Sequence, residues 1–242
     1  MMNTILKRID GSILDFSKLE NNKDILDFLS QKKNQTDFIL NEINSGYYDR
    51  FFEDEKDLII LDMGAHIGMF SNYISPAAAI IYSFEPFPKH FNLLESITLN
   101  DKKILTFNYA INTENGKNIK FYVRPENPTM NGLNHNNDGY YVDEGISVNT
   151  INLKEICKMS PYFDFVKMDI EGAEYDVFAQ LSEDEYLRNL VAGKFKSILI
   201  ECHDNYKKNR SDTLIFVNDI LLKMEYNVEK INEATLFAEL RF

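Results

Sequence analysis

An acid and two glycines stand at residues 62–68 with the spacing Asp-x-Gly-x-x-x-Gly. Glycines allow a backbone to approach a ligand closely, and the first N–H groups of a helix are free to bind it. The aliphatic run at 58–61 is typical of a strand that is buried on both faces of a parallel sheet. An apolar run from residue 67 can begin a helix. A strand, a turn and a helix in this order predict a site for a nucleoside cofactor.

The spacing of these glycines distinguishes between classes of cofactor. Dinucleotides bind to Gly-x-Gly-x-x-Gly, whose glycines lie against a pyrophosphate, and the chain lacks that pattern. S-adenosylmethionine has no phosphate, and its ammonium group favours a nearby carboxylate such as that of Asp62. We therefore expect Asp62, Gly64, Ala65, His66 and Gly68 to bind this cofactor. The alternative is an ordinary strand–turn–helix unit of another α/β protein.

Glu85 follows a second expected strand, at 79–84, and lies 23 positions after the acid of the turn. An acid at this place can accept both hydroxyl protons of a ribose diol; alternatively, it is a solvent-exposed acid at a strand end. Pro86 comes next, and Asn108 and Ala110 end a third strand. A small alanine leaves room for an adenine ring, whereas turn propensity explains Asn108 equally well. We expect all four residues to complete the cofactor site.

Residues 165–174 read Phe-Val-Lys-Met-Asp-Ile-Glu-Gly-Ala-Glu and form a second chemically distinctive stretch. Alternation along a strand places Lys167 and Asp169 on one face. A lysine within a strand that is buried on both faces is costly unless it is paired, and the acid two residues later is a natural partner. Ligands of open α/β sheets bind at this end of a strand. We expect Lys167 and Asp169 to lie at a ligand-binding end of the sheet; a structural ion pair beside a helix cap is the alternative.

His203 ends another expected strand, at 196–202, and lies beside Asp169 if the two strands are neighbours. Histidine titrates near neutral pH, so His203 and Asp169 are both candidate general bases; a merely polar strand-end residue is the simpler interpretation of His203. Together with Glu171 they can hold a divalent ion, but the spacing does not demand one, and we predict no metal ligand. The other histidines are expected to border the cofactor (His66), to be solvated in a long loop (His135) and to lie on the surface (His90).

The order of the expected elements is β-α-β-α-β followed by further strands, which implies a largely parallel sheet. We expect an N-terminal extension at 1–56, with a hairpin at 3–17 and helices near 24–28 and 38–43, packed on a main domain at 57–242. A long loop at 124–145, rich in Pro, Gly and Asn, is typical of functional loops. The remaining expected elements are helices at 67–74, 88–98, 173–181 and 213–222, strands at 104–109 and 164–170, and a terminal hairpin of 226–231 with 235–240.

The composition indicates a globular chain of one domain with an extension. The chain has 242 residues, of which 44% are hydrophobic, and its net charge of −12 argues against a broad basic surface for nucleic acid. No apolar run approaches the ~20 residues of a membrane span. Cys157 and Cys202 are too few for a disulfide framework, and no signal-peptide pattern precedes them, so we expect a cytoplasmic protein.

Five segments resemble the FkbM family of S-adenosylmethionine-dependent methyltransferases, in the family's order and over about 60–203. The element Lys-x-Asp-x-Glu-Gly-x-Glu is the most specific of them, whereas the first motif occurs in many methyltransferases. Residues 1–56 and 124–145 match no pattern of the family. The segments are LDMGAHIGMFS at 61–71, YSFEPFPKHFNLL at 82–94, NYAIN at 108–112, FVKMDIEGAEYDVF at 165–178 and ILIECH at 198–203.

The resemblance implies a Rossmann-like class I methyltransferase fold: a mostly parallel seven-stranded sheet with a C-terminal antiparallel hairpin and helices on both faces. It also implies methylation of an oxygen, commonly a hydroxyl of a sugar or polyketide. Residue by residue, it places Asp62, Gly64, Gly68, Glu85 and Ala110 at the cofactor, and Lys167, Asp169, Glu171 and His203 at the acceptor. Two other functions stay open from the residues alone: a nicotinamide-dependent oxidoreductase, which the glycine spacing disfavours, and a non-catalytic Rossmann module.

Overall fold

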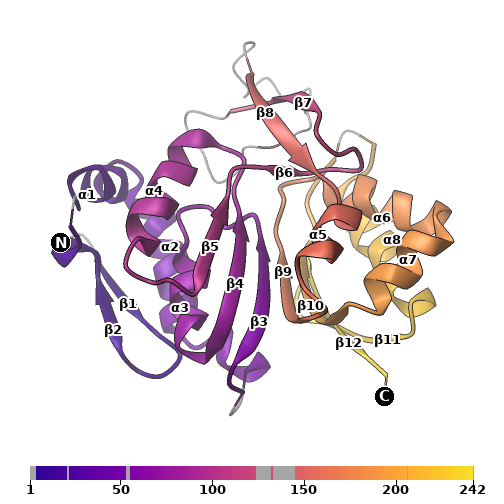
Figure 1. Ribbon diagram of the computed structural model, residues 1–242, viewed down its shortest axis with the longest axis horizontal. Coiled ribbons are helices and arrows are strands. Elements are labelled where there is room, and N and C mark those ends of the chain that lie inside the picture. Colours follow the sequence, from indigo (N-terminus) through magenta and orange to yellow (C-terminus); the bar gives the residue numbers. More distant parts are fainter. Residues whose placement is uncertain are drawn as a thin grey trace.

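The computed structural model describes residues 4–20, 22–52, 55–123, 132, 145–205 and 207–241. A seven-stranded sheet forms its centre, with the order β11-β12-β10-β9-β3-β4-β5 (Figure 1). The expected terminal hairpin is confirmed, because β12 pairs antiparallel with both β10 and β11. The strands of this sheet are β3 Leu58–Met63, β4 Ala78–Phe84, β5 Ile104–Phe107, β9 Phe163–Met168, β10 Phe195–Glu201, β11 Tyr226–Lys230 and β12 Thr235–Leu240.

The chain changes direction across the sheet between β3 and β9. From β3 it adds β4 and β5 on one side, and it later returns to add β9 and β10 on the other, all in parallel. In open α/β sheets, the carboxyl ends of strands that flank such a switch point form the ligand-binding crevice. The register of β3 against β9 places Asp62 opposite Lys167 and Met63 opposite Met168. Both motifs of the sequence therefore meet at this crevice.

Helices cover both faces of the sheet (Figure 1). The N-terminal helices lie with α3 and α4 on one face, and the later helices lie on the other. A two-stranded hairpin, β1 Ile5–Lys7 with β2 Ile13–Asp15, precedes them as expected. The helices are α1 Asn22–Gln31, α2 Lys33–Asn44, α3 Met69–Ile74, α4 Pro88–Thr98, α5 Leu153–Met159, α6 Glu174–Glu183, α7 Glu185–Ala192 and α8 Arg210–Lys223, with short 3₁₀ turns η1 Phe16–Lys18, η2 Asp49–Phe51 and η3 Ser75–Ala77.

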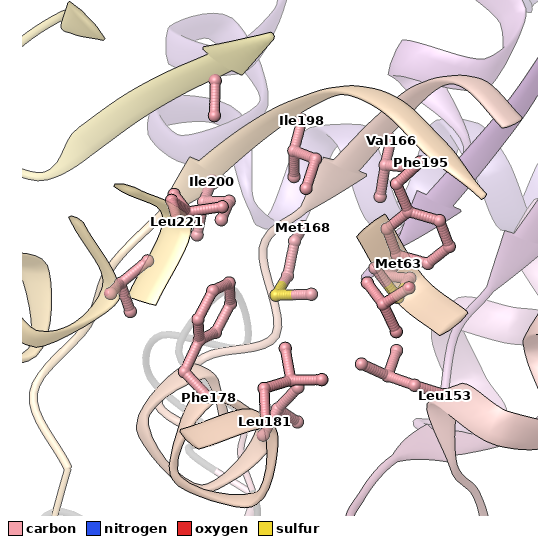
Figure 2. Packing of buried hydrophobic residues seen from close by; sticks show 14 of the residues in the cluster. Met63, Leu153, Val166, Met168, Phe178, Leu181, Phe195, Ile198, Ile200 and Leu221 are labelled. Carbon is pink, nitrogen blue, oxygen red and sulfur yellow. The ribbon is translucent and has the colours of Figure 1, made fainter. Parts of the chain in front are cut away.

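Alternation along β9 serves two hydrophobic cores. Val166 and Met168 point into a core between the sheet and α5–α8, where Phe178 of α6 and Leu221 of α8 pack against the strands (Figure 2). Phe165 points to the opposite core, which includes buried side chains of the N-terminal helices. Lys167 shares the face of Phe165 by the same alternation. The strand is thus buried on both faces, as its composition predicts.

A small second sheet lies beyond the carboxyl end of the central strands (Figure 1). Its strands β6 Ala110–Ile111, β7 Asn118–Phe121 and β8 Ile146–Ile151 have the order β6-β8-β7. The sequence did not predict this small sheet, because the strands of the sheet are short and flank the polar segment 124–145. It also did not predict the helices α5 and α7. Of that predicted loop, the structure describes Gly132, which bridges to Tyr122, and Gly145; the rest, with His135, lies outside the described residues.

The boundaries of most predicted elements shift by a few residues. The third strand ends at Phe107, so Asn108 and Ala110 follow it rather than end it. The first two helices are longer than their apolar repeats, and Leu40 and Ile43 of α2 belong to the core beneath the turn after β3. Within the described part of the chain, none of the helices is long and apolar enough to cross a membrane.

Candidate active site

The turn between β3 and α3 depends on glycines in the left-handed region. Gly64 and Gly68 have φ of 87° and 86°, a conformation that costs glycine little. A Cβ atom on Gly64 would lie 1.7 Å from the carbonyl oxygen of Asp169, so the turn lies directly against the end of β9. A Cβ atom on Gly68 would lie 2.5 Å from Cδ1 of Leu94 in α4. Gly64 therefore joins the two motifs, and Gly68 lets α3 pack against α4.

Glu85 is buried at the end of β4, and the backbone holds both of its oxygens. Oε2 accepts the N–H of His66 at 3.0 Å, and Oε1 accepts the N–H of Phe87 at 2.9 Å. A carboxylate offers about four acceptor positions, so two remain for other donors. Burial raises the pKa of Glu85 to about 7, although His66 and both N–H groups favour the charged form. Glu85 is thus held in one orientation, with acceptor positions left for other donors.

His90 is buried, so the expectation that it lies on the surface is wrong. Its ring lies 4.2 Å from that of His66, 5.6 Å from Phe28 of α1 and 4.8 Å from Phe87, measured between centroids. Burial lowers the pKa of His90 and of His66 to about 3. Both imidazoles are therefore neutral at physiological pH and form an aromatic support beneath the turn.

Lys167 is a buried cation that connects the two motifs. Its Nζ lies 3.1 Å from Oδ2 of Asp169 and 3.9 Å from Oδ1 of Asp62, and it donates to the carbonyl oxygen of Gly64 at 3.5 Å. Burial opposes the charge of Lys167, but Asp169 and Asp62 outweigh it and raise its pKa. Asp62 is fully buried and accepts the hydroxyl of Ser71 at 2.6 Å. The Asp62 carboxylate thus lies beneath the site and supports Lys167.

His203 follows β10 and faces the carboxylates after β9. The two strands are parallel neighbours, which confirms the expected proximity: Nε2 lies 3.8 Å from Oδ1 of Asp169 and 3.6 Å from Oε2 of Glu171. Nδ1 lies 3.1 Å from Oε1 of the fully buried Glu174. Burial opposes the charge of Asp169, but Lys167 and His203 outweigh it and lower its pKa. Burial also opposes a charged His203, but Glu171 and Glu174 raise the pKa of this imidazole well above its usual value.

Two cavities open at this edge of the sheet and share part of their walls. Cavity 1 extends toward β4 and the small sheet, and its distinctive lining comes from Glu85, Pro86, Tyr109, Ala110, Ile111 and Phe121. Cavity 2 extends toward α2 and β10, and its distinctive lining comes from Phe38, Glu42, Tyr48, Lys167, Glu201 and His203. Both are lined by Ile39, Gly64, His66, Asp169 and Glu171.

The shared wall contains strained backbone. His66 and Glu171 have φ of 52° and 53°, in the left-handed region that side chains with a Cβ rarely adopt. Such residues persist where the surrounding structure holds them, and they cluster at functional sites. Gly172, with φ of 98°, continues the same turn after Glu171. Both strained residues, His66 and Glu171, thus lie in the wall that the two cavities share.

The structure distributes the predicted site residues over three places. Of the residues expected at the cofactor, Gly64, His66, Glu85, Pro86 and Ala110 line cavity 1, and Ala65 lines cavity 2. Asp62, Gly68 and Asn108 support the site from outside both linings; the amide of Asn108 donates to the carbonyl oxygens of Glu85 and Pro86 at 2.8 and 3.0 Å. The four residues expected at the acceptor line cavity 2: Lys167, Asp169, Glu171 and His203.

Sequence reasoning missed several lining residues. Tyr109, which lines cavity 1, stands between Asn108 and Ala110 in the segment at 108–112. Glu201, which lines cavity 2, belongs to the segment at 198–203 that ends in His203. Glu42 of α2 and Tyr48, which directly precedes η2, carried no signal because they lie outside every recognised motif; both line cavity 2. His90 carried a signal, because Leu94 and Ile97 follow it at helical spacing on the buried face of α4.

The switch-point crevice, the turn without a dinucleotide fingerprint and the buried Glu85 define an S-adenosylmethionine-dependent methyltransferase with a Rossmann-like class I fold. The model of the Methyltransferase FkbM domain matches residues 62–228. The chain belongs to the FkbM methyltransferase family. This membership replaces the oxidoreductase and the non-catalytic module as interpretations of the sequence.

Three solved structures of other proteins are similar to this chain at low sequence identity. Precorrin-6y C5,15-methyltransferase from Geobacter metallireducens is 12% identical, with 78% of this chain and 84% of that chain covered and a TM-score of 0.44. Aeropyrum pernix fibrillarin with natively bound S-adenosyl-L-methionine is 8% identical, covering 76% and 66%, with a TM-score of 0.43. A SAM-dependent methyltransferase from Aquifex aeolicus is 12% identical, covering 81% and 88%, with a TM-score of 0.41. No curated protein sequence matches the chain.

Proposed function

We propose that this enzyme methylates a hydroxyl group of a sugar, glycan or similar small molecule, with the methyl donor in cavity 1 and the acceptor in cavity 2. The observation that supports this most directly is the wall shared by the cavities. A donor and an acceptor on either side of Gly64, His66, Asp169 and Glu171 can meet only at this junction. In-line transfer between two bound molecules needs such a meeting point, because alignment supplies much of the rate.

The residues of cavity 1 fit S-adenosylmethionine. Glu85 would hold the ribose hydroxyls with the acceptor positions that its backbone contacts leave free. Tyr109, Ala110 and Ile111 provide an apolar lining suited to an adenine ring. The absence of a side chain at Gly64 lets the turn lie against the ligand and against β9 at once. The bound cofactor supplies an activated methyl group, so the protein has to orient and deprotonate the acceptor.

Asp169 is the residue that we assign as general base. An alcohol is a weak nucleophile and must lose its proton as the new bond forms. Asp169 lines both cavities, whereas His203 lines cavity 2 only. The ammonium group of Lys167 fixes Oδ2 of Asp169 at 3.1 Å. The carboxylate is therefore held at the junction, where the acceptor oxygen has to lie.

The charges around cavity 2 favour an acceptor without phosphate groups. Glu42, Asp169, Glu171 and Glu201 all line it, and the whole chain has a net charge of −12. Such a cavity repels a polyanion, so a nucleic acid is a poor acceptor. Phe38 and Tyr48 add apolar surface that suits the face of a sugar ring. We further propose a cytoplasmic location, which the two free, buried cysteines support.

The substitution Asp169→Asn tests this function. Methyl transfer from labelled S-adenosylmethionine would be measured against a panel of methyl glycosides and polyols, and the affinity for S-adenosylhomocysteine by calorimetry. We expect turnover to fall at least ~100-fold, the usual minimum contribution of a general base, with the dissociation constant of S-adenosylhomocysteine changed less than about twofold. Asp219→Asn, on the exposed side of α8, is the matched control. Full turnover by Asp169→Asn, or loss of S-adenosylhomocysteine binding, would contradict the assignment.

A further inference from the structure

The imidazole of His203 is fixed so that one nitrogen faces a group of carboxylates. Nδ1 lies 3.1 Å from Oε1 of Glu174, and the Glu174 carboxylate is itself held by the N–H groups of Ile170 and Gly172 at 3.0 and 2.9 Å. A buried carboxylate on one ring nitrogen is the arrangement that orients metal-binding histidines and selects the tautomer. It leaves Nε2 of His203 facing the carboxylates that line cavity 2.

Three carboxylates surround Nε2 without reaching it. Oδ1 of Asp169 lies at 3.8 Å, and Oε2 of Glu171 and Oε1 of Glu201 each lie at 3.6 Å. These separations exceed hydrogen-bond range. Without a metal ion, these carboxylates favour a proton on the imidazole and raise its pKa; a metal cation between Nε2 and the carboxylates would take the place of that proton. The His203 side chain is only 12% exposed, so bulk water screens the field of the carboxylates poorly.

The separations fit the coordination shell of one ion. Hard divalent cations bind such atoms at about 2.1 Å, so neighbouring or opposite ligands of one ion are about 3.0 to 4.2 Å apart. The ligand atoms of Asp169, Glu171 and His203 all lie within 4.8 Å of one another, so a side-chain movement of about 0.6 Å or less brings them to the spacing of ligands on one ion. Lys167 cannot fill this place, because its ammonium group bonds to the other oxygen of Asp169.

We propose that a divalent cation of the Mg²⁺ or Mn²⁺ type binds at Oδ1 of Asp169, Oε2 of Glu171 and Nε2 of His203, with Glu201 as an adjacent fourth carboxylate. The proposal rests on the function proposed above and deepens it, because the site lies in the wall of cavity 2. Positions of the ion that the protein leaves open would bind water or an oxygen of the acceptor. Oδ2 of Asp169, on Lys167, stays available to receive the acceptor's proton. An acceptor with two adjacent oxygens fits this site best.

Titration of the metal-free full-length enzyme with Mn²⁺ tests the proposal without any turnover. Free Mn²⁺ would be measured by electron paramagnetic resonance, with Mg²⁺ as competitor. We expect one saturable site per chain, weakened at least tenfold in both Glu171→Gln and His203→Gln. Glu183→Gln, an exposed acid at the end of α6, should leave the affinity unchanged. Circular dichroism and thermal melting establish that each variant folds. If only one of the two site variants folds, that variant is enough for the test.

Two results would overturn the cation site: no saturable binding of Mn²⁺ by the wild type at millimolar concentration, or equal affinity in the wild type and the folded site variants. Calorimetry with S-adenosylhomocysteine on the same samples separates this failure from failure of the proposed function. A protein that binds S-adenosylhomocysteine but not Mn²⁺ refutes the cation alone. A protein that binds Mn²⁺ at these residues, but turns over no acceptor hydroxyl in its presence, refutes the proposed function alone.

Discussion

We expect Glu85 to make the affinity for S-adenosylhomocysteine, the product nucleoside, depend on pH. The carboxylate is buried, and burial raises its pKa to about 7. Only the charged form accepts both ribose hydroxyls, so binding should strengthen as pH rises through this value. Between pH 6 and pH 8 the ionised fraction rises from about one tenth to about nine tenths, a change of about tenfold or ~1.4 kcal/mol in binding free energy.

The assay is calorimetric titration of S-adenosylhomocysteine at pH 6, 7 and 8 with the wild type, Glu85→Gln and Glu95→Gln. Glu85→Gln should bind more weakly at pH 8 and lose the tenfold slope, whereas Glu95→Gln, on the exposed face of α4, should keep it. Any pH dependence that comes from titration of the ligand itself is the same for all three proteins, so it cancels when their affinities are compared. The neighbouring His66 and His90 have pKa values of about 3 and stay neutral throughout.

Proton release gives an independent reading of the same effect. If binding favours the carboxylate, S-adenosylhomocysteine must lower the pKa of Glu85 by linkage. Titration at pH 6 in buffers of different ionisation enthalpy should then show close to one proton released per ligand, falling toward zero above pH 8. Equal pH slopes in the wild type and Glu85→Gln would refute the reasoning, because the slope would then come from another group.

Two further substitutions test how the site is built. Gly64→Ala should abolish S-adenosylhomocysteine binding and destabilise the fold, because the added Cβ would lie 1.7 Å from the carbonyl oxygen of Asp169. Gly116→Ala is the control and should lower the free energy of unfolding much less. Gly116 has φ of 66° and open space around it, so only the left-handed cost of about 1–2 kcal/mol applies. Equal unfolding free energies would contradict that contact. Lys167→Met should cost about 3–5 kcal/mol in urea unfolding, because it leaves the buried carboxylate of Asp62 and the partly buried carboxylate of Asp169 without their cation. The exposed Lys158→Met should cost less than about 1 kcal/mol, and a similar small loss for Lys167→Met would show that Lys167 does not stabilise the buried acids.

The parts of the site that the sequence predicted share one property: they stand at carboxyl ends of strands. Period-2 alternation and the switch-point rule place Lys167, Asp169 and His203 together without any knowledge of packing. The same reasoning places Glu85 at the end of β4. These relations are local in the chain or follow from parallel topology, so the residue pattern alone carries them.

The missed parts depend on contacts between distant segments. Whether Asp62 faces a ligand or a buried lysine depends on the register of β3 against β9, which its motif does not specify. The role of Glu174 depends on how α6 docks beneath β10, where it meets His203. The small sheet needs β8 to pair with two strands that lie earlier in the chain: Thr150 pairs with Ala110, 40 residues before it, and Ile146 pairs with Phe121, 25 residues before it. Short polar strands carry little pattern, because their stability comes from this pairing.

The wall of cavity 2 explains why the acceptor is harder to derive than the donor. Cavity 1 draws its distinctive residues from the segments that the family model matches, at 62–228. Cavity 2 instead takes Phe38, Glu42 and Tyr48 from the part of the chain before that match. The distinctive lining of cavity 1 therefore comes from the matched segment, whereas Ile39 of the shared wall and part of the lining of cavity 2 come from residues before it. Selection for a new acceptor can alter α2 without disturbing Gly64 or its contact with β9, so acceptor specificity should vary most at these N-terminal positions.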